Sequence, residues 1–231
     1  MQAQDLALFT AALGLSKPWE VVSVEFDPER KRLDVGVDFP KGSTFGCPEW
    51  ASMKLGPTLI DKPTLEEGVA RLAEEIDRDQ KGRPALLVGI LKGSIFFLCD
   101  LAKSLKTPVT IDFLQVSSYG SGTKSSGNVR LLRDLSTDVA GRDVIIVEDI
   151  VDTGRTLQKI IQILSTRQPR SVKICALLKK KIPDNQGIPV DYLGFTIDDH
   201  FVVGYGLDHA EEYRNLPYIG ILEPDAEASR T

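Results

Sequence analysis

Three carboxylates follow a short run of branched apolar residues in the segment VIIVEDIVDTGRT, residues 144–156. Residues 144–147 have the pattern of a buried strand, and Glu148, Asp149 and Asp152 come directly after it. A helical pattern begins near Thr156, and the start of a helix offers free N–H groups and positive dipole charge to an anion. Paired acids beside an anion site need sugar hydroxyls or a magnesium ion as partners.

The turn between the strand and the helix suits a phosphate group. Gly154 permits close backbone approach, and the hydroxyls of Thr153 and Thr156 can donate further hydrogen bonds. An alternative is that the acids only cap and solvate the helix start. No GxxxxGK[ST] motif occurs in the sequence, so hydrolysis of a nucleoside triphosphate is disfavoured.

The composition is typical of a soluble globular protein: 231 residues, 42% hydrophobic, 26% charged, with a net charge of -5. The acidic balance argues against a general nucleic-acid binder. No segment approaches the ~20 apolar residues that span a bilayer, and no secretion signal is apparent. Cys47, Cys99 and Cys175 form no CxxC pair, which favours a reduced, cytoplasmic setting without a disulfide framework.

From residue 57 onward, strand patterns alternate with helix patterns. A capping box of Thr64 and Glu67 predicts a helix start, and further helices are expected at residues 94–105 and about 153–166. Strands are expected at residues 85–91, 108–116, 143–149, 171–178 and 201–205. This order predicts an α/β fold with a mostly parallel, doubly wound sheet, in which ligands bind beyond the carboxyl ends of the strands.

The first 50 residues differ in texture from the rest. Residues 7–15 have a helix-like pattern, and residues 19–39 alternate apolar and polar positions around a turn, which predicts a β-hairpin. We therefore divide the chain into an N-terminal extension, residues 1–50, and a main domain, residues 51–231.

Five ordered segments around residues 144–156 resemble those of one enzyme family. The stretch VEDIVDTGRT resembles the phosphoribosyl-pyrophosphate signature of the type I phosphoribosyltransferases, and its neighbours resemble the hypoxanthine-guanine branch. These neighbours are LKGS (91–94), SSYG (117–120), KKK (179–181), FVVGYGLD (201–208) and EYRNL (212–216). The resemblance covers residues 57–223. It implies the type I phosphoribosyltransferase fold with a small hood, and purine salvage: transfer of 5-phosphoribose to hypoxanthine or guanine, giving IMP or GMP and pyrophosphate.

The resemblance also implies roles for the acids and the turn. Glu148 and Asp149 would hold the ribose hydroxyls directly or through Mg²⁺-bound water, and Asp152 would take a proton from the purine as general base. Asp152 could instead only position the purine. The 5-phosphate would lie against the turn formed by Asp152, Thr153, Gly154, Arg155 and Thr156.

In the same family, a lysine donates to the 6-oxo group of the purine. Lys180 aligns with it, although Lys179 or Lys181 would replace it if the strand register shifted by one, and a KKK run is often a solvated surface. Phe201 would stack on the purine ring and Val202 would offer backbone groups to its edge, although the same stretch has the pattern of a core strand.

Further family positions concern the pyrophosphate. Asp208 would border the purine and hold a second Mg²⁺, completing a metal set with Glu148 and Asp149, and Arg214 would contact the pyrophosphate; each could equally form a plain salt bridge. Lys92 and Gly93 would bend around the pyrophosphate, often after a cis peptide bond from Leu91, although a plain turn is the alternative. Ser118 and Tyr119 would belong to a lid loop, residues 117–128, that shields the reacting sugar from water.

The N-terminal extension resembles the N-terminal segment of a bacterial transposase family. In that family a CPxC motif begins a zinc module, but here Cys47 is followed by Trp50 in place of the second cysteine, so zinc binding is disfavoured. The extension is expected to be a borrowed hairpin or an oligomer contact. The family implies small-molecule substrates and a dimer or tetramer, with no nucleic-acid or membrane partner. The competing hypothesis is a nucleotide-sensing regulatory protein on the same scaffold.

Overall fold

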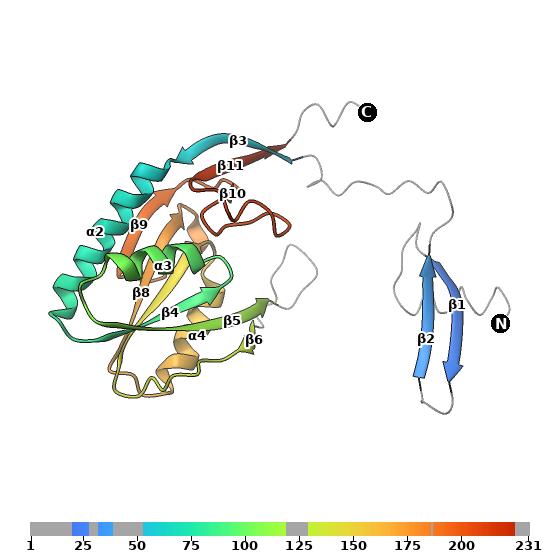
Figure 1. The fold of residues 1–231 in the computed structure, drawn as a ribbon, viewed down its shortest axis with the longest axis horizontal. Coiled ribbons are helices and arrows are strands. Elements are labelled where there is room, and N and C mark those ends of the chain that lie inside the picture. Colours follow the sequence, from blue (N-terminus) through green and yellow to red (C-terminus); the bar gives the residue numbers. More distant parts are fainter. Residues whose placement is uncertain (1–19, 28–31, 39–52, 119–128, 186, 225–231) are drawn as a thin grey trace. The chain divides into compact units, whose positions relative to one another are not determined.

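The computed structural model describes residues 20–27, 32–38, 53–118, 129–185 and 187–224, which belong to two compact units (Figure 1). One unit comprises Met1–Ser52 with Ala226–Thr231, and the other is Met53–Asp225. In the first, β1 (Glu20–Asp27) pairs antiparallel with β2 (Arg32–Asp38), so the predicted hairpin is confirmed. The helix-like residues 7–15 and the segment with Cys47 and Trp50 lie outside the described residues.

The main unit contains a six-stranded sheet in the order β6-β5-β4-β7-β8-β9 (Figure 1). Its strands are β4 (Ala85–Leu91), β5 (Val109–Ser118), β6 (Val129–Arg133), β7 (Asp143–Val151), β8 (Ser171–Lys180) and β9 (Tyr192–Ile197). All neighbouring pairs are parallel except β5 with β6. The predicted mostly parallel, doubly wound sheet is therefore confirmed, and the carboxyl ends of β4, β7 and β8 meet at one edge.

Helices cover both faces of this sheet, and the sheet separates two clusters of buried apolar side chains. On one face, α2 (Lys62–Gln80) and α3 (Ile95–Ser104) bury residues such as Leu72 and Phe97 against the sheet. On the other face, α4 (Arg155–Ser165) buries Leu157, Ile160 and Leu164. Successive strand residues point to opposite faces, so β7 contributes Ile145 to the first cluster and Val144 to the second.

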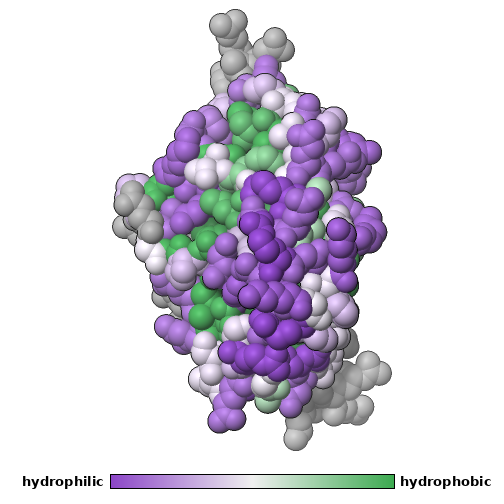
Figure 2. Space-filling model, turned by 90° about the vertical axis from the view of Figure 1, so that its left-hand side faces the viewer, coloured by the Kyte–Doolittle hydropathy of each residue, from purple (hydrophilic) through white to green (hydrophobic). Residues whose placement is uncertain are grey.

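The start of α2 differs from the expected capping box. Asp61 is the N-cap, and its Oδ1 accepts a hydrogen bond of 3.0 Å from the backbone N–H of Thr64, so the helix begins at Lys62 rather than at Thr64. Pro63 suits the first turn because its missing N–H would have had no helical partner. The outer face of α2 is hydrophilic (Figure 2) and carries the ion pair Arg71–Glu75.

A second, three-stranded sheet forms what we call the hood. It has the order β10-β11-β3 and consists of β3 (Met53–Ile60), β10 (Val202–Val203) and β11 (Ile219–Pro224), all antiparallel. The strand expected at residues 201–205 is therefore wrong in length and place: it is shorter and belongs to the hood. It ends because Gly204, with φ of +98°, and Tyr205, with φ of 52°, turn the chain away from the strand.

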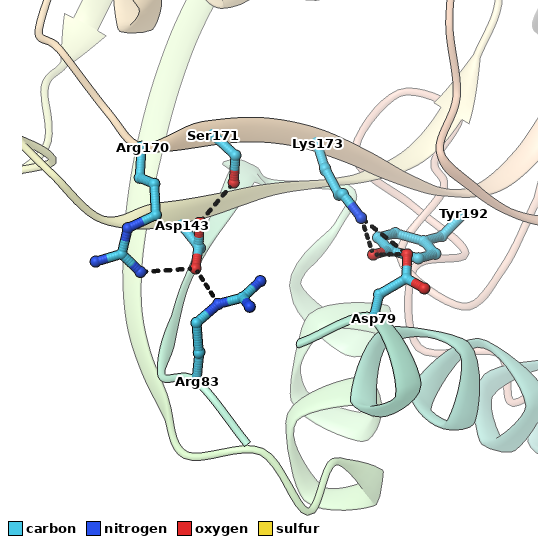
Figure 3. A network of polar contacts seen from close by, with 7 residues as sticks. All are labelled: Asp79, Arg83, Asp143, Arg170, Ser171, Lys173 and Tyr192. Carbon is cyan, nitrogen blue, oxygen red and sulfur yellow. Dashed lines mark hydrogen bonds and ion pairs between the residues drawn. The ribbon is translucent and has the colours of Figure 1, made fainter. Parts of the chain in front are cut away.

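The amino ends of the central strands are held by a polar network (Figure 3). Asp143 is buried and accepts hydrogen bonds from Ser171 (2.8 Å), Arg170 (3.1 Å) and Arg83 (3.3 Å). Burial raises the pKa of Asp143, but these hydrogen bonds and the arginine charges outweigh it, so the pKa is lowered and the group stays ionised. This network lies at the opposite end of β7 from Asp149, and it supports the sheet rather than the candidate site.

Candidate functional site

A pocket of about 260 Å³ opens where the carboxyl ends of the central strands face the hood. Its lining brings together side chains from three segments that are far apart in the sequence: Asp149, Ile150, Asp152, Lys180, His200, Phe201, Val202, Leu207 and Asp208. Six of these, all but Ile150, His200 and Leu207, were predicted site residues. The structure thus places Asp149 near the end of β7, Asp152 just after it, Lys180 at the end of β8 and the segment 200–208 around one cavity.

The acid pair near the end of β7, Glu148 and Asp149, is half-buried. The Oε2 atom of Glu148 is buried and has no hydrogen-bond partner within the described part of the chain. Burial, and then the charge of Asp149, raises the pKa of Glu148 well above its usual range. Burial likewise raises the pKa of Asp149 to about 6, although the N–H of Ile150 donates to its Oδ1 atom. Two such carboxylates need hydroxyl donors or a cation.

The turn between β7 and α4, residues 152–154, ends at a glycine in a left-handed conformation; we call it the phosphate turn. Gly154 is the N-cap of α4 with φ of 66°, and among the described residues no side chain caps this helix start. Thr153 and Thr156 are half-buried beside it, whereas Arg155 is exposed. A Cβ atom at Gly154 would overlap the side chain of Ile188, so only glycine fits between that side chain and the turn. The first N–H groups of α4 are therefore available to an anion.

The turn after β4 lies against the acid pair. The peptide bond between Leu91 and Lys92 is cis, as the family resemblance implied. A Cβ atom at Gly93 would overlap the carboxylate of Asp149, and one at Gly206 would overlap the carbonyl of Gly93. These close approaches bring the backbone at Gly93 directly to the acids.

Cationic side chains border this turn. The Nζ atom of Lys92 lies 2.9 Å from Glu211. A guanidinium nitrogen of Arg214 lies 2.8 Å from Asp208, another donates to the carbonyl of Gly206 at 2.7 Å, and the Nε atom is buried without a partner among the described residues. Arg214 and Asp208 therefore form an ion pair beside the acids, and Arg214 keeps one unused donor.

The structure distinguishes the three consecutive lysines at the end of β8. The Nζ atom of Lys179 donates to the carbonyl of Ile188 at 3.3 Å, and that of Lys181 lies 3.1 Å from the exposed Asp198. Lys180 has a side chain only 15% exposed that lines the pocket, with its Nζ atom 2.8 Å from Asp199 and 4.0 Å from Asp152. Of the three, Lys180 is the one directed to the pocket.

An aromatic wall completes the pocket. Phe201 is 47% exposed and lines the pocket, and the rings of Phe201 and His209 are nearly perpendicular with centroids 5.5 Å apart. Val202 is buried beside it in β10. Two residues here were not predicted from the sequence. His200 directly precedes Phe201 and lines the pocket, and Asp199 pairs with Lys180 because the chain returns through β9 beside β8.

The structure describes the predicted lid loop and the predicted metal site only in part. Strand β5 ends at Ser118, while Tyr119 and the rest of the expected lid, to residue 128, lie outside the described residues. Within the described ranges, no three His, Cys, Asp or Glu side chains converge as a metal site. No helix in the described part of the chain is both long and apolar enough to cross a membrane.

The fold and the site define a phosphoribosyltransferase. The chain matches the family model for the phosphoribosyl transferase domain over residues 58–210, and it belongs to this family. It is 49% identical over 174 residues to the hypoxanthine-guanine phosphoribosyltransferase of Mycobacterium avium, a match that covers 72% of this chain and 85% of that protein.

Two further relatives bear on fold and length. A crystal structure of a hypoxanthine phosphoribosyltransferase from Staphylococcus aureus is similar with a TM-score of 0.71 and 43% identity, over 74% of this chain and 93% of that one. The bifunctional protein TilS/HprT of Listeria innocua is 49% identical over 167 residues, or 72% of this chain. The chain spans only 26% of the length of that protein.

Proposed function

We propose that this protein transfers the 5-phosphoribosyl group of phosphoribosyl pyrophosphate to hypoxanthine or guanine, giving IMP or GMP and pyrophosphate. One observation carries the proposal: a single pocket holds Asp152, Lys180 and Phe201, directly beside the glycine-capped start of α4. The relatives described above have names that state this activity.

Each part of the substrate has a matching group. The N–H groups at the start of α4 donate hydrogen bonds to the 5-phosphate, and the acid pair Glu148 and Asp149 accepts hydrogen bonds from the ribose hydroxyls. Lys180 donates to the 6-oxo group, and Phe201 stacks on the purine ring. An amino group at position 6 offers no comparable acceptor, so adenine is excluded.

Asp152 is the general base of the proposed reaction and accepts the proton of the purine. The purine nitrogen attacks C1 of the ribose, the bond from C1 to the pyrophosphate oxygen breaks, and the purine proton passes to the Asp152 carboxylate. The side chain of Asp152 is more than half exposed and has Lys180 as a neighbour, so its carboxylate is accessible at the mouth of the pocket. Arg214, which has a spare donor, and Lys92 stabilise the departing pyrophosphate.

Glu148 and Asp149 have the chemistry to hold Mg²⁺, although with Asp208 they do not already converge as a three-carboxylate site among the described residues. The orphaned Oε2 atom of Glu148 and the raised pKa of Asp149 are what a hard divalent cation would relieve, with Asp208 as a further carboxylate. When bound, Mg²⁺ would offset the negative charge of the pyrophosphate as it leaves.

The proposal is tested by rates with hypoxanthine, guanine, xanthine and adenine, measured with phosphoribosyl pyrophosphate with and without Mg²⁺. We expect Mg²⁺-dependent nucleotide formation with hypoxanthine or guanine, at least about 100-fold faster than with adenine. Absence of turnover with both oxopurines, in a protein that melts cooperatively, would overturn the proposed activity.

We also propose a cytoplasmic location and a dimer or tetramer, as the family resemblance implies. Light scattering after size-exclusion chromatography measures the oligomeric state, and removal of residues 1–50 shows whether the extension contributes. A regulatory protein on this scaffold would instead bind nucleotide without turnover and retain DNA or RNA in a salt-dependent way.

A further inference from the structure

A buried asparagine lies behind the candidate site. Asn185 ends the 3₁₀ turn Pro183–Asn185 that follows β8, and it is 1% exposed. Its Nδ2 atom donates to three backbone carbonyls: Asp152 at 2.7 Å, Lys180 at 2.8 Å and Val151 at 3.3 Å. A primary amide has only two N–H donors, so the longest of the three bonds is shared with another.

These carbonyls belong to the two strand ends that carry the reaction. Val151 and Asp152 lie where β7 passes into the phosphate turn, and Lys180 is the last residue of β8. The strands pair only as far as Val151 with Lys179. Beyond that pair the two strands are not paired with each other. The Asn185 amide instead links them, because it donates to the backbone carbonyl of Asp152, the candidate base, and to that of Lys180, the candidate purine-binding lysine.

The same segment supports the phosphate turn three residues later. The N–H of Ile188 donates to the carbonyl of Asn185 at 3.2 Å, and its buried side chain occupies the space where a Cβ atom at Gly154 would lie. Lys179 fixes the carbonyl of Ile188 from β8. Hydrogen bonds therefore link Asn185 to both strand ends, and link Ile188 both to Asn185 and to β8.

We propose that Asn185 is a positioning residue for the transfer reaction, and that its amide sets the placement of Asp152 relative to Lys180. This inference rests on the proposed function. It concerns backbone placement alone, because the Asn185 side chain is buried behind the strand ends and does not line the pocket. An alanine would leave the three carbonyls without this donor and would let the strand ends separate.

The test compares Asn185→Ala with a structural control, Asp143→Asn. Asp143 is also buried and accepts three hydrogen bonds, but it lies at the opposite end of the sheet. We expect kcat/KM for hypoxanthine to fall about 10- to 100-fold in the Asn185→Ala variant, since misplacement by about 1 Å has effects of this size. The control variant should have a lower melting temperature than the wild type and a kcat/KM within about twofold of it.

A double-mutant cycle separates positioning from general weakening. The effect of Asn185→Ala on kcat/KM is measured in the wild type and in a Lys180→Met background. We expect the fold-decrease in the Lys180→Met background to be at least about threefold smaller than in the wild type, because the effects of interacting residues are not additive. If the alanine variant does not fold, Asn185→Ser, which keeps one donor, is measured in the same cycle. An unchanged rate, or additive effects, would overturn the role of Asn185 while wild-type turnover still supports the proposed function. No turnover by the folded wild type would overturn both.

Discussion

The Nζ atom of Lys180 lies 4.0 Å from the Oδ1 atom of Asp152 at the mouth of the pocket. A donor and an acceptor at this separation match the 6-oxo group and the neighbouring ring nitrogen on one edge of an oxopurine. The pair is held from β8 and from the turn after β7, so in the proposed reaction purine recognition and proton transfer would depend on the same two strand ends.

Asp152→Asn removes the proton acceptor and keeps the shape of the side chain. We expect kcat to fall about 10²- to 10⁴-fold, the usual contribution of a general base. The dissociation constant of phosphoribosyl pyrophosphate, measured by calorimetry, should change less than about threefold. If kcat is unchanged, Asp152 only positions the purine.

Lys180→Met and Lys181→Met form a matched pair, since the lysines are adjacent and each meets an aspartate. Only Lys180 lines the pocket. We expect the first variant to lose at least about tenfold in kcat/KM for hypoxanthine, as a charged hydrogen bond is lost, and the second to stay within about twofold. Equal losses would show that the run acts only through its general charge.

Gly93→Ala places a methyl group where the Asp149 carboxylate lies. The acid must move, so we expect phosphoribosyl pyrophosphate to bind at least about tenfold more weakly, because small displacements of positioning groups are costly. Gly187→Ala is the control, since a Cβ atom there meets nothing within 4 Å. Calorimetric titration of both variants measures the effect, and equal affinities would contradict the steric argument.

Asp149→Asn should stabilise the metal-free protein at neutral pH. Burial raises the folded-state pKa of Asp149 from 3.8 to about 6, so the folded state holds more protons than the unfolded state between these values. Stability therefore falls as the pH rises through this window and stays low above it. The asparagine variant escapes this loss, which gives it about 1–3 kcal/mol more stability at pH 7.5.

Urea unfolding in EDTA at pH 7.5 and pH 3.5 measures this difference. The advantage of the variant should disappear at pH 3.5, where Asp149 is protonated in the folded protein. The same variant should bind phosphoribosyl pyrophosphate and Mg²⁺ more weakly. An advantage that is equal at both pH values would mean that ionised Asp149 is not the source of the instability.

The parallel sheet could be predicted from the sequence because continuous apolar runs such as ALLVGIL carry the signal of strands buried on both faces. The acids at the end of β7 followed from that strand, since their position after residue 147 placed them at its carboxyl edge. Lys180 could not be separated from its neighbours by sequence, because a one-residue shift reverses the face of every side chain. The pairing with Asp199 and the 15% exposure separate it in the structure.

The hood was harder to predict. Strand β3 (Met53–Ile60) pairs with β11 (Ile219–Pro224) from the far end of the unit's sequence, and such a long-range pairing leaves little local signal. Strand β10 has only two residues, Val202–Val203. The role of Asn185 was also missed, because a lone asparagine after a lysine run is typical of a turn. Only the side-by-side ends of β7 and β8 give its amide three carbonyls to hold.

Strand β3 begins the main unit and β11 closes it, and Met53 is the partner of Pro224 in their ladder. The first and last strands of the unit therefore lie side by side in the hood, with their outer ends paired. A segment fused before residue 53 or after residue 224 would therefore join the unit at one place, away from the strand ends where phosphoribose and purine would meet. A circularly permuted chain that joins these two residues would keep every pairing of both sheets.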